Sequence, residues 1–148
     1  MKNIIRQKPP GTKLKMNLCA NAAQVRHVLE HGGYQIRIES ARVIFAKTGN
    51  ILVALDAVET AGNRPIAIQP LWIAGPNAAD STIAAENQAL LAQLLEFAGQ
   101  NTSGEIDIEN SVPKLVGLIV SARLSIELDS RTGRSHNSIV AVYTEGAS

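Results

Sequence analysis

Residues 34–45 constrain the fold more than any other stretch, because they have the pattern of one long strand whose buried side changes half-way. The alternating apolar positions form two sets of opposite parity, Tyr34, Ile36 and Ile38 and then Ala41, Val43 and Phe45. A slip of one residue exchanges the two faces of a strand, so the pattern predicts a bulge or sharp bend between the sets. We expect both Tyr34 and Phe45 to point into the core.

Short turns divide the rest of the chain into further strands and helices. Turn residues such as Gly49 and Asn50 tolerate a positive φ and favour hairpins. Pro65 and Pro70 indicate an edge or a bend in the strand that contains them. A polar, acidic loop is expected at 100–114. The remaining predicted elements are strands at 51–59, 64–73, 116–128 and 136–144, a helix at 80–98 and a short helix at 21–31.

The predicted order is three strands, one helix and two strands, which is the element order of an OB-fold. We therefore predict a mainly β fold: a five-stranded, partly open barrel with one helix between strands 3 and 4 and a short N-terminal helix or arm. The rival is an α+β roll with the helix on an open sheet. A length of 148 residues suits one domain, which gives a basic N-terminal arm at 1–20 and a single OB-fold-like domain at 21–148.

Charge is distributed unevenly although the net charge is only +1. Residues 1–50 hold nine basic and two acidic residues, whereas both later thirds are net acidic. Such asymmetry indicates an anionic partner, with a solubilising basic tail as the alternative. The sequence predicts no membrane span, because no apolar stretch approaches 20 residues, and a cytoplasmic protein. The single cysteine, Cys19, excludes a disulfide framework and is expected to be a small buried residue.

Catalytic motifs are scarce, so we expect neither an enzyme nor a bound cofactor or metal. His27 and His31 have i, i+4 spacing, but no third ligand accompanies them and an exposed helix face explains them better. Asp107 and Glu109 fit a solvated loop better than an acid–base pair. The chain contains neither a glycine-rich phosphate loop nor a nucleophile elbow.

Binding chemistry fits the predicted fold better. Oligonucleotides lie on the face of OB-fold strands 2 and 3, between the loops that join strands 1–2 and 4–5. Both loops are cationic here, and a single strand needs cations for its phosphates and flat groups for its bases. The parity of Trp72 with Ile66 and Ile68 favours the core, with base stacking as the alternative. The candidate nucleic-acid-binding residues are Arg37, Arg42, Lys47, Arg64, Trp72, Arg123, Arg131, Arg134 and His136.

Several short motifs, in their order and spacing, resemble a family of small bacteriophage OB-fold proteins similar to single-stranded-DNA-binding proteins. The motifs are Gly33-Tyr34-Gln35-Ile36-Arg37-Ile38, Lys47-Thr48-Gly49-Asn50, Leu71-Trp72, Pro76-Asn77, Phe97-Ala98-Gly99, Leu115-Val116-Gly117 and His136-Asn137. The resemblance implies single-stranded DNA binding without sequence specificity, in phage DNA replication or recombination, and no enzymatic activity. The basic N-terminal stretch departs from the acidic one expected of the family.

Two further interpretations remain open at this level. The same barrel can serve as a protein-interaction or assembly module without nucleic-acid binding, and exposed sheet edges can join copies into a homo-oligomer. Nothing in the sequence separates DNA from RNA as the bound strand.

Overall fold

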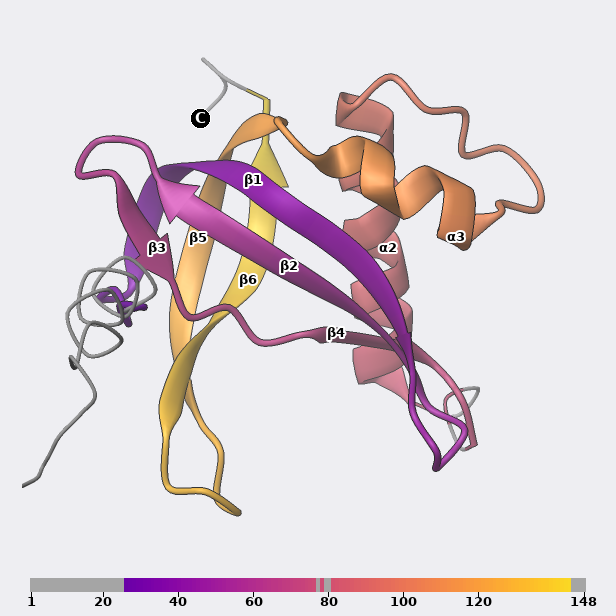
Figure 1. Cartoon of the computed structure of the whole chain (residues 1–148), viewed down its shortest axis with the longest axis horizontal. Helices are drawn as coiled ribbons and strands as arrows, with labels where there is room; N and C mark the ends of the chain where they lie inside the picture. Colours follow the sequence, from indigo (N-terminus) through magenta and orange to yellow (C-terminus); the bar gives the residue numbers. More distant parts are fainter. Residues whose placement is uncertain (1–25, 77, 79–80, 145–148) are drawn as a thin grey trace, which may run out of the picture.

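The computed structural model describes residues 26–76, 78 and 81–144. These residues form a mainly β fold in which one long helix covers part of a strongly curled antiparallel sheet (Figure 1). The predicted arm at 1–20 and Cys19 lie outside the described residues. The elements in chain order are β1 (Gly32–Phe45), β2 (Ile51–Glu59), β3 (Arg64–Ile66), β4 (Leu71–Ala74), α2 (Thr82–Phe97), α3 (Ile108–Ser111), the 3-10 helix η2 (Val112–Leu115), β5 (Ile119–Leu128) and β6 (Ser135–Tyr143).

The predicted change of face in the first strand is confirmed. Strand β1 pairs with β2 in antiparallel register, and the register shifts between Ile38 and Ser40. Ile36 and Ile38 are buried before the shift and Ala41 is buried after it. The extra residue bends β1, which pairs with β5 from Gly32 to Arg37 and with β2 from Ile36 to Phe45. The prediction that Phe45 points into the core is wrong, because Phe45 lies at the end of β1 and is 58% exposed.

The sheet has the strand order β3-β2-β1-β5-β6, and β4 also pairs with β2, near the start of that strand. The predicted third strand at 64–73 is therefore wrong as one element: it is two short strands, which gives six rather than five. Pro65 and Pro70 have no N–H to donate to a ladder. Between them the backbone leaves β2, so Ala67 N donates to His27 O (2.9 Å) and Gln69 N donates to Asn137 O (2.9 Å).

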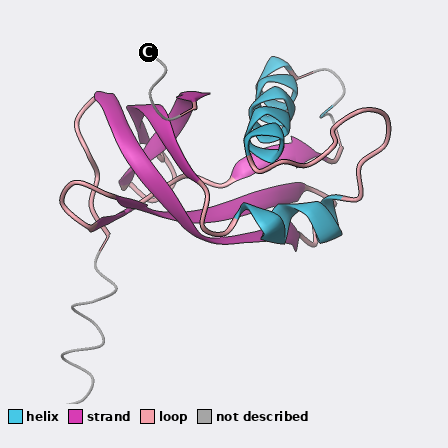
Figure 2. Cartoon of the chain, turned by 90° about the horizontal axis from the view of Figure 1, so that it is seen from above, coloured by secondary structure: helices cyan, strands magenta, loops and turns pink. Residues whose placement is uncertain are grey.

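The two ends of the sheet approach each other without a continuous ladder. One parallel bridge joins Ile68, on the segment between β3 and β4, to Asn137 of β6. Figure 2 shows the resulting curled sheet with α2 at its open side. The mainly β fold is thus confirmed, but the sheet is not closed into the predicted five-stranded barrel, and its two ends meet at this bridge.

Helix α2 begins and ends close to the predicted bounds. Ser81 is its N-cap, and the Ser81 hydroxyl accepts a hydrogen bond from Ala84 N (3.3 Å). The helix is amphipathic, and Ile83 in its first turn is 60% exposed. The side chains that pack into the core from α2 are Ala84, Leu90, Leu91, Leu94 and Leu95.

Three boundary predictions need correction. The helix expected at 21–31 is not formed in its described part, because residues 26–31 run extended and His27 bridges to Ile66 of β3. The loop expected at 100–114 contains α3 and η2, and Asp107 caps α3 while Val112 and Leu115 are fully buried. The strand expected from residue 116 begins at Ile119, because Gly117 adopts a positive φ of 93°.

Candidate nucleic-acid interface

The segment from Gln69 to Trp72 connects the bases of the two cationic hairpins. At one end, Ser138 Oγ of β6 lies 3.1 Å from Gln69 Oε1. At the other end, Trp72 Nε1 donates to Asn50 Oδ1 of the β1–β2 loop (3.1 Å). Three residue steps of extended chain, from Gln69 to Trp72, span about 10 Å. Figure 1 shows both hairpin loops projecting on the same side of the molecule, with β4 between them.

The β1–β2 loop is a compact turn that packs on the end of β4. Ala46 N donates to Asn50 O (2.9 Å) and Gly49 N donates to Ala46 O (3.0 Å). Gly75 follows β4 with a φ of 134°, and a Cβ at this position would lie 2.8 Å from the Asn50 Cα. Only glycine permits so close an approach. The loop is thereby fixed against β4, and it carries the exposed Lys47 at its tip.

The β5–β6 loop presents two arginines to solvent. Gly133 N donates to Asp129 O (2.7 Å), Asp129 N donates to Arg134 O (2.8 Å), and these bonds close the turn. Arg131 N donates to Asp129 Oδ1 (2.9 Å), and this bond holds the pKa of the Asp129 carboxyl below its ordinary value. The Arg131 guanidinium is 87% exposed and 3.9 Å from the same carboxylate, so it stays free to reach outward.

Trp72 lies on the outer face of the sheet, which corrects the core interpretation. Its neighbours Leu71 and Ile73 are buried, and Trp72 itself is half-buried and pairs with Leu52 across β2. The prediction from parity failed because β3 ends at Ile66 and β4 begins at Leu71, so the in-and-out alternation of side chains does not continue from Ile66 to Trp72. An indole with one partly open side, fixed by its bond to Asn50, can stack on a base.

A mixed-charge patch borders Trp72 on the same outer face. Arg42 of β1 pairs with Ala54 of β2 two positions beyond the Ile44–Leu52 pair, and Ser40 pairs with Asp56 four positions beyond it. Asp56 receives hydrogen bonds from Ser40 Oγ (2.5 Å) and from Arg26, and Arg42 Nη1 lies 3.8 Å away. Partial burial pushes the pKa of Asp56 upward, but these bonds outweigh it, so the pKa lies below its ordinary value. One carboxylate thus faces two arginines, which leaves Arg42 available for an anion.

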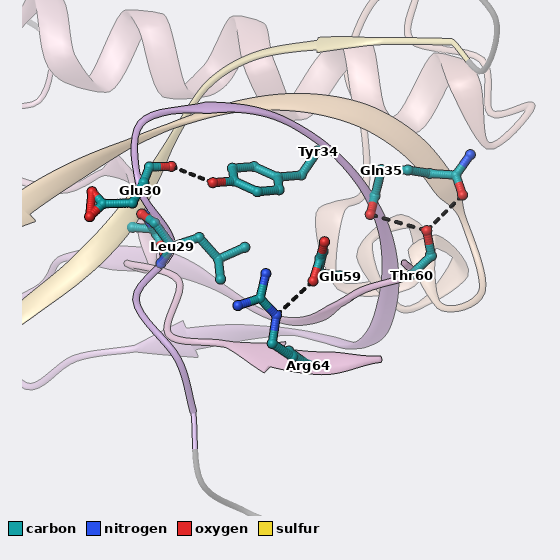
Figure 3. A network of polar contacts seen from close by, with 8 residues as sticks. Leu29, Glu30, Tyr34, Gln35, Glu59, Thr60 and Arg64 are labelled. Carbon is teal, nitrogen blue, oxygen red and sulfur yellow. Dashed lines mark hydrogen bonds and ion pairs between the residues drawn. The ribbon is translucent and has the colours of Figure 1, made fainter. Parts of the chain in front are cut away.

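Four of the predicted site residues have other neighbours in the structure. Arg37 donates to Glu39 (2.5 Å), and Arg64 donates to Glu59 (2.8 Å) at the far end of β2 (Figure 3). Arg123 lines a separate cavity of about 360 Å³ with Tyr34 and Tyr143. His136 pairs across the β5–β6 hairpin with Glu127. The structure therefore leaves Arg42, Lys47, Trp72, Arg131 and Arg134 as the candidates for the interface, gives Arg37, Arg64 and Arg123 other surroundings, and places His136 in β6, two residues beyond Arg134.

The acidic groove, as we call it, is a larger hollow of about 750 Å³ between α2, β4 and the β5–β6 hairpin. Its charged lining residues among the described part of the chain are Glu86 and Glu127, with no lysine or arginine. Both carboxylates are exposed. A polyanion is repelled from this groove, which makes the cationic hairpins the better place for phosphates.

Asn137 is the residue whose importance the sequence analysis missed. Its side chain is fully buried: Oδ1 accepts from Leu29 N (2.8 Å), and Nδ2 donates to Leu29 O (2.9 Å) and Ser125 O (3.0 Å). Its backbone forms the bridge to the 67–69 segment. An asparagine at the same parity as buried Ile139 was the available signal, because a polar residue at an inward position has to be hydrogen-bonded.

Comparison with protein-family models and with curated proteins finds no match for this chain. No helix in the described ranges combines the length and apolar character that a bilayer crossing requires. Within the same residues, no three His, Cys, Asp or Glu side chains are grouped as metal ligands would be. The function therefore has to be argued from the geometry around β4.

Proposed function

We propose that the chain binds single-stranded nucleic acid across β4, between the β1–β2 and β5–β6 hairpins. The observation that carries the proposal is the placement of an outward Trp72 between two hairpins whose cations, Lys47, Arg131 and Arg134, are exposed. Cations neutralise phosphates while an aromatic face stacks on a base, and neither contact depends on base identity. The proposal extends to the phage family that the sequence resembles, and to DNA as the strand bound in replication or recombination.

The strand connections support an OB-fold-like arrangement. β1 pairs with both β2 and β5, and the bridge between Ile68 and Asn137 brings the third-strand segment beside the last strand in parallel. An OB-fold is a partly open five-stranded barrel that binds oligonucleotides on strands 2 and 3 and on two of its loops. In this proposal, strand β2, strand β4 and the two cationic hairpins take the corresponding positions.

The proposal is tested by the salt dependence of binding to an unstructured oligo-dT. If about four phosphates are neutralised, log Kd changes with log salt by a slope of magnitude about 3, since each contact to a single strand contributes about 0.7. Arg131→Ala with Arg134→Ala is expected to weaken binding at low salt and to halve the slope, with no change in melting temperature.

A matched control removes two other cations. Arg37→Ala with Lys114→Ala changes the net charge equally, but Arg37 is paired with Glu39 and Lys114 lies in η2. This control is expected to retain the wild-type slope. An unchanged dissociation constant in the Arg131/Arg134 variant would remove the hairpin from the site, and no binding by the wild-type protein would overturn the proposal.

A second candidate function, a protein-interaction module, is favoured by the outer edge of β6. This strand ends the sheet order, and Val140 and Tyr143 on it are 57% and 38% exposed. An open edge with apolar side chains can add a strand from another chain. Size-exclusion chromatography with and without oligo-dT separates the two candidates: an oligomer that ignores the oligonucleotide supports the interaction module.

A further inference from the structure

The acidic groove between α2, β4 and the β5–β6 hairpin borders the proposed nucleic-acid contact and shares Gln69 and Trp72 with it. Apolar side chains also open into it, and Ile83 and Val140 are 60% and 57% exposed. Glu86 and Glu127 form no ion pair with any described residue. The groove therefore offers apolar surface bordered by two unneutralised carboxylates, which fits a segment that is both apolar and basic.

We propose that the basic N-terminal segment of the same chain, residues 1–25, docks in this groove. The segment contains Lys2, Arg6, Lys8, Lys13 and Lys15 and no acidic residue, and Ile4, Ile5, Leu14, Met16 and Leu18 supply apolar side chains. The charge of the segment complements that of the groove. The two carboxylates that carry the inference, Glu86 of α2 and Glu127 of β5, lie outside the two cationic loops, so its test does not require nucleic-acid binding.

The attachment point of the segment supports an intramolecular contact. The described chain starts at Arg26, and His27 pairs directly with the backbone of Pro65 and Ala67. Ala67 stands two residues, about 7 Å of extended chain, from Gln69, which lines the groove. The residues between Lys15 and Arg26 can span up to about 36 Å. A tether this short gives an effective concentration in the millimolar range, well above that of a second copy at ordinary protein concentrations.

The chain itself supplies a probe pair, because it has one tryptophan and one cysteine. Trp72 lines the groove and Cys19 lies in the N-terminal segment. Energy transfer is measured from Trp72 to an aminonaphthalene-sulfonate label on Cys19 in the full chain, with unlabelled protein of each variant as the donor reference. Transfer at low salt is expected to exceed that in about 1 M salt, where the Debye length is near 3 Å.

Glu86→Gln with Glu127→Gln is expected to lower the transfer at low salt to the high-salt value of the wild-type protein. Glu105→Gln with Glu109→Gln makes the same charge change outside the groove and is expected to leave it unchanged. Equal transfer in the wild-type protein and the groove variant would overturn the proposal. Transfer that rises with protein concentration would also overturn it, because the segment would then occupy the groove of a second copy.

A charge exchange provides a second readout that does not depend on the stability of a single variant. Glu86→Lys with Glu127→Lys, and separately Lys13→Glu with Lys15→Glu, are each expected to abolish the salt-dependent transfer. Combining all four substitutions is expected to restore it, because the attraction is re-formed with the signs reversed. Failure of the combined variant to recover transfer, in a protein with the wild-type melting temperature, would overturn the proposal.

Discussion

The two cationic hairpins and the acidic groove share β4 as a border, yet they differ in every property that matters for a ligand. The hairpins expose Lys47, Arg131 and Arg134 on small polar turns, whereas the groove exposes two carboxylates beside apolar side chains. A net charge of +1 conceals this separation. The difference teaches that a nearly neutral chain can still direct a polyanion to one surface and a basic segment to another.

Asn137 holds the two regions in their relative positions, so its removal is expected to have the largest effect. Asn137→Ala leaves Leu29 N, Leu29 O and Ser125 O without their partners and is expected to cost about 3 kcal/mol of the free energy of unfolding. Urea unfolding followed by circular dichroism measures the loss. Asn101→Ala, at an exposed loop position, is the control and is expected to cost less than about 0.5 kcal/mol. A loss below about 1 kcal/mol for Asn137→Ala would contradict the role assigned to it.

Trp72 tests whether the hairpin side binds through stacking as well as through charge. Trp72→Ala is expected to weaken oligo-dT binding by about 2 kcal/mol, roughly 30-fold in Kd, while the salt slope stays at its wild-type value. Anisotropy of a labelled oligonucleotide measures both quantities. Trp72→Phe keeps an aromatic face but loses the bond to Asn50, so an intermediate Kd is expected. A changed slope would instead mean that the cationic loops had moved.

Arg64 tests the comparison with a cation outside the cationic loops, because its ion pair with Glu59 gives it a role in stability rather than in binding. Its partner Glu59 has a side chain only 10% exposed, so Arg64→Ala leaves a nearly buried carboxylate unpaired. The expected cost is about 1.5 kcal/mol of the free energy of unfolding, with Kd for oligo-dT within about twofold of wild type. Arg37→Ala, in a pair whose two members are both exposed, is the control and is expected to be nearly neutral. A large loss of binding in Arg64→Ala would return this residue to the site.

Asp56 has the smallest expected effect, and it appears as a dependence on pH. Because the pKa of the folded Asp56 lies below the ordinary value of 3.8, its ionised form contributes stability above that value. The contribution is lost as the pH falls through the lower folded pKa. Asp56→Asn is expected to cost about 1 kcal/mol at pH 7, with the side chain one-third exposed, and progressively less below pH 4. Urea unfolding at pH 7 and pH 3 measures the difference, and an equal cost at both values would contradict it.

Local patterns predicted the parts of the fold that depend on neighbouring residues. The change of parity between Ile38 and Ala41 located the bulge, the turn residues after Phe45 located the hairpin, and the helix predicted at 80–98 located α2. Strand β2 matches its predicted bounds because its apolar run ends at turns on both sides. Alternation and capping are set by the backbone period, so they can be identified without knowledge of the partner strand.

The predicted site was less accurate, for reasons found in particular residues. Arg37 and Arg64 look like free cations in the sequence, but each meets a carboxylate, one of them five residues earlier in the chain. Trp72 changed face because the strand is interrupted between Ile66 and Leu71, where Pro70 lies. The described part of the predicted N-terminal helix is extended because His27 pairs with β3 instead. Each of these outcomes depends on what lies nearby in space.

The sequence by itself determined the β-rich composition of elements, the bend in β1, the position of α2 and the cationic character of two hairpin loops. The tertiary structure alone decided which arginines are neutralised, that Trp72 faces outward, that Asn137 joins three separate segments, and that an acidic groove lies beside β4. The physical reason is the distance along the chain over which each effect acts. Backbone periodicity acts over a few residues, whereas ion pairing and burial depend on distances between atoms that only packing brings together.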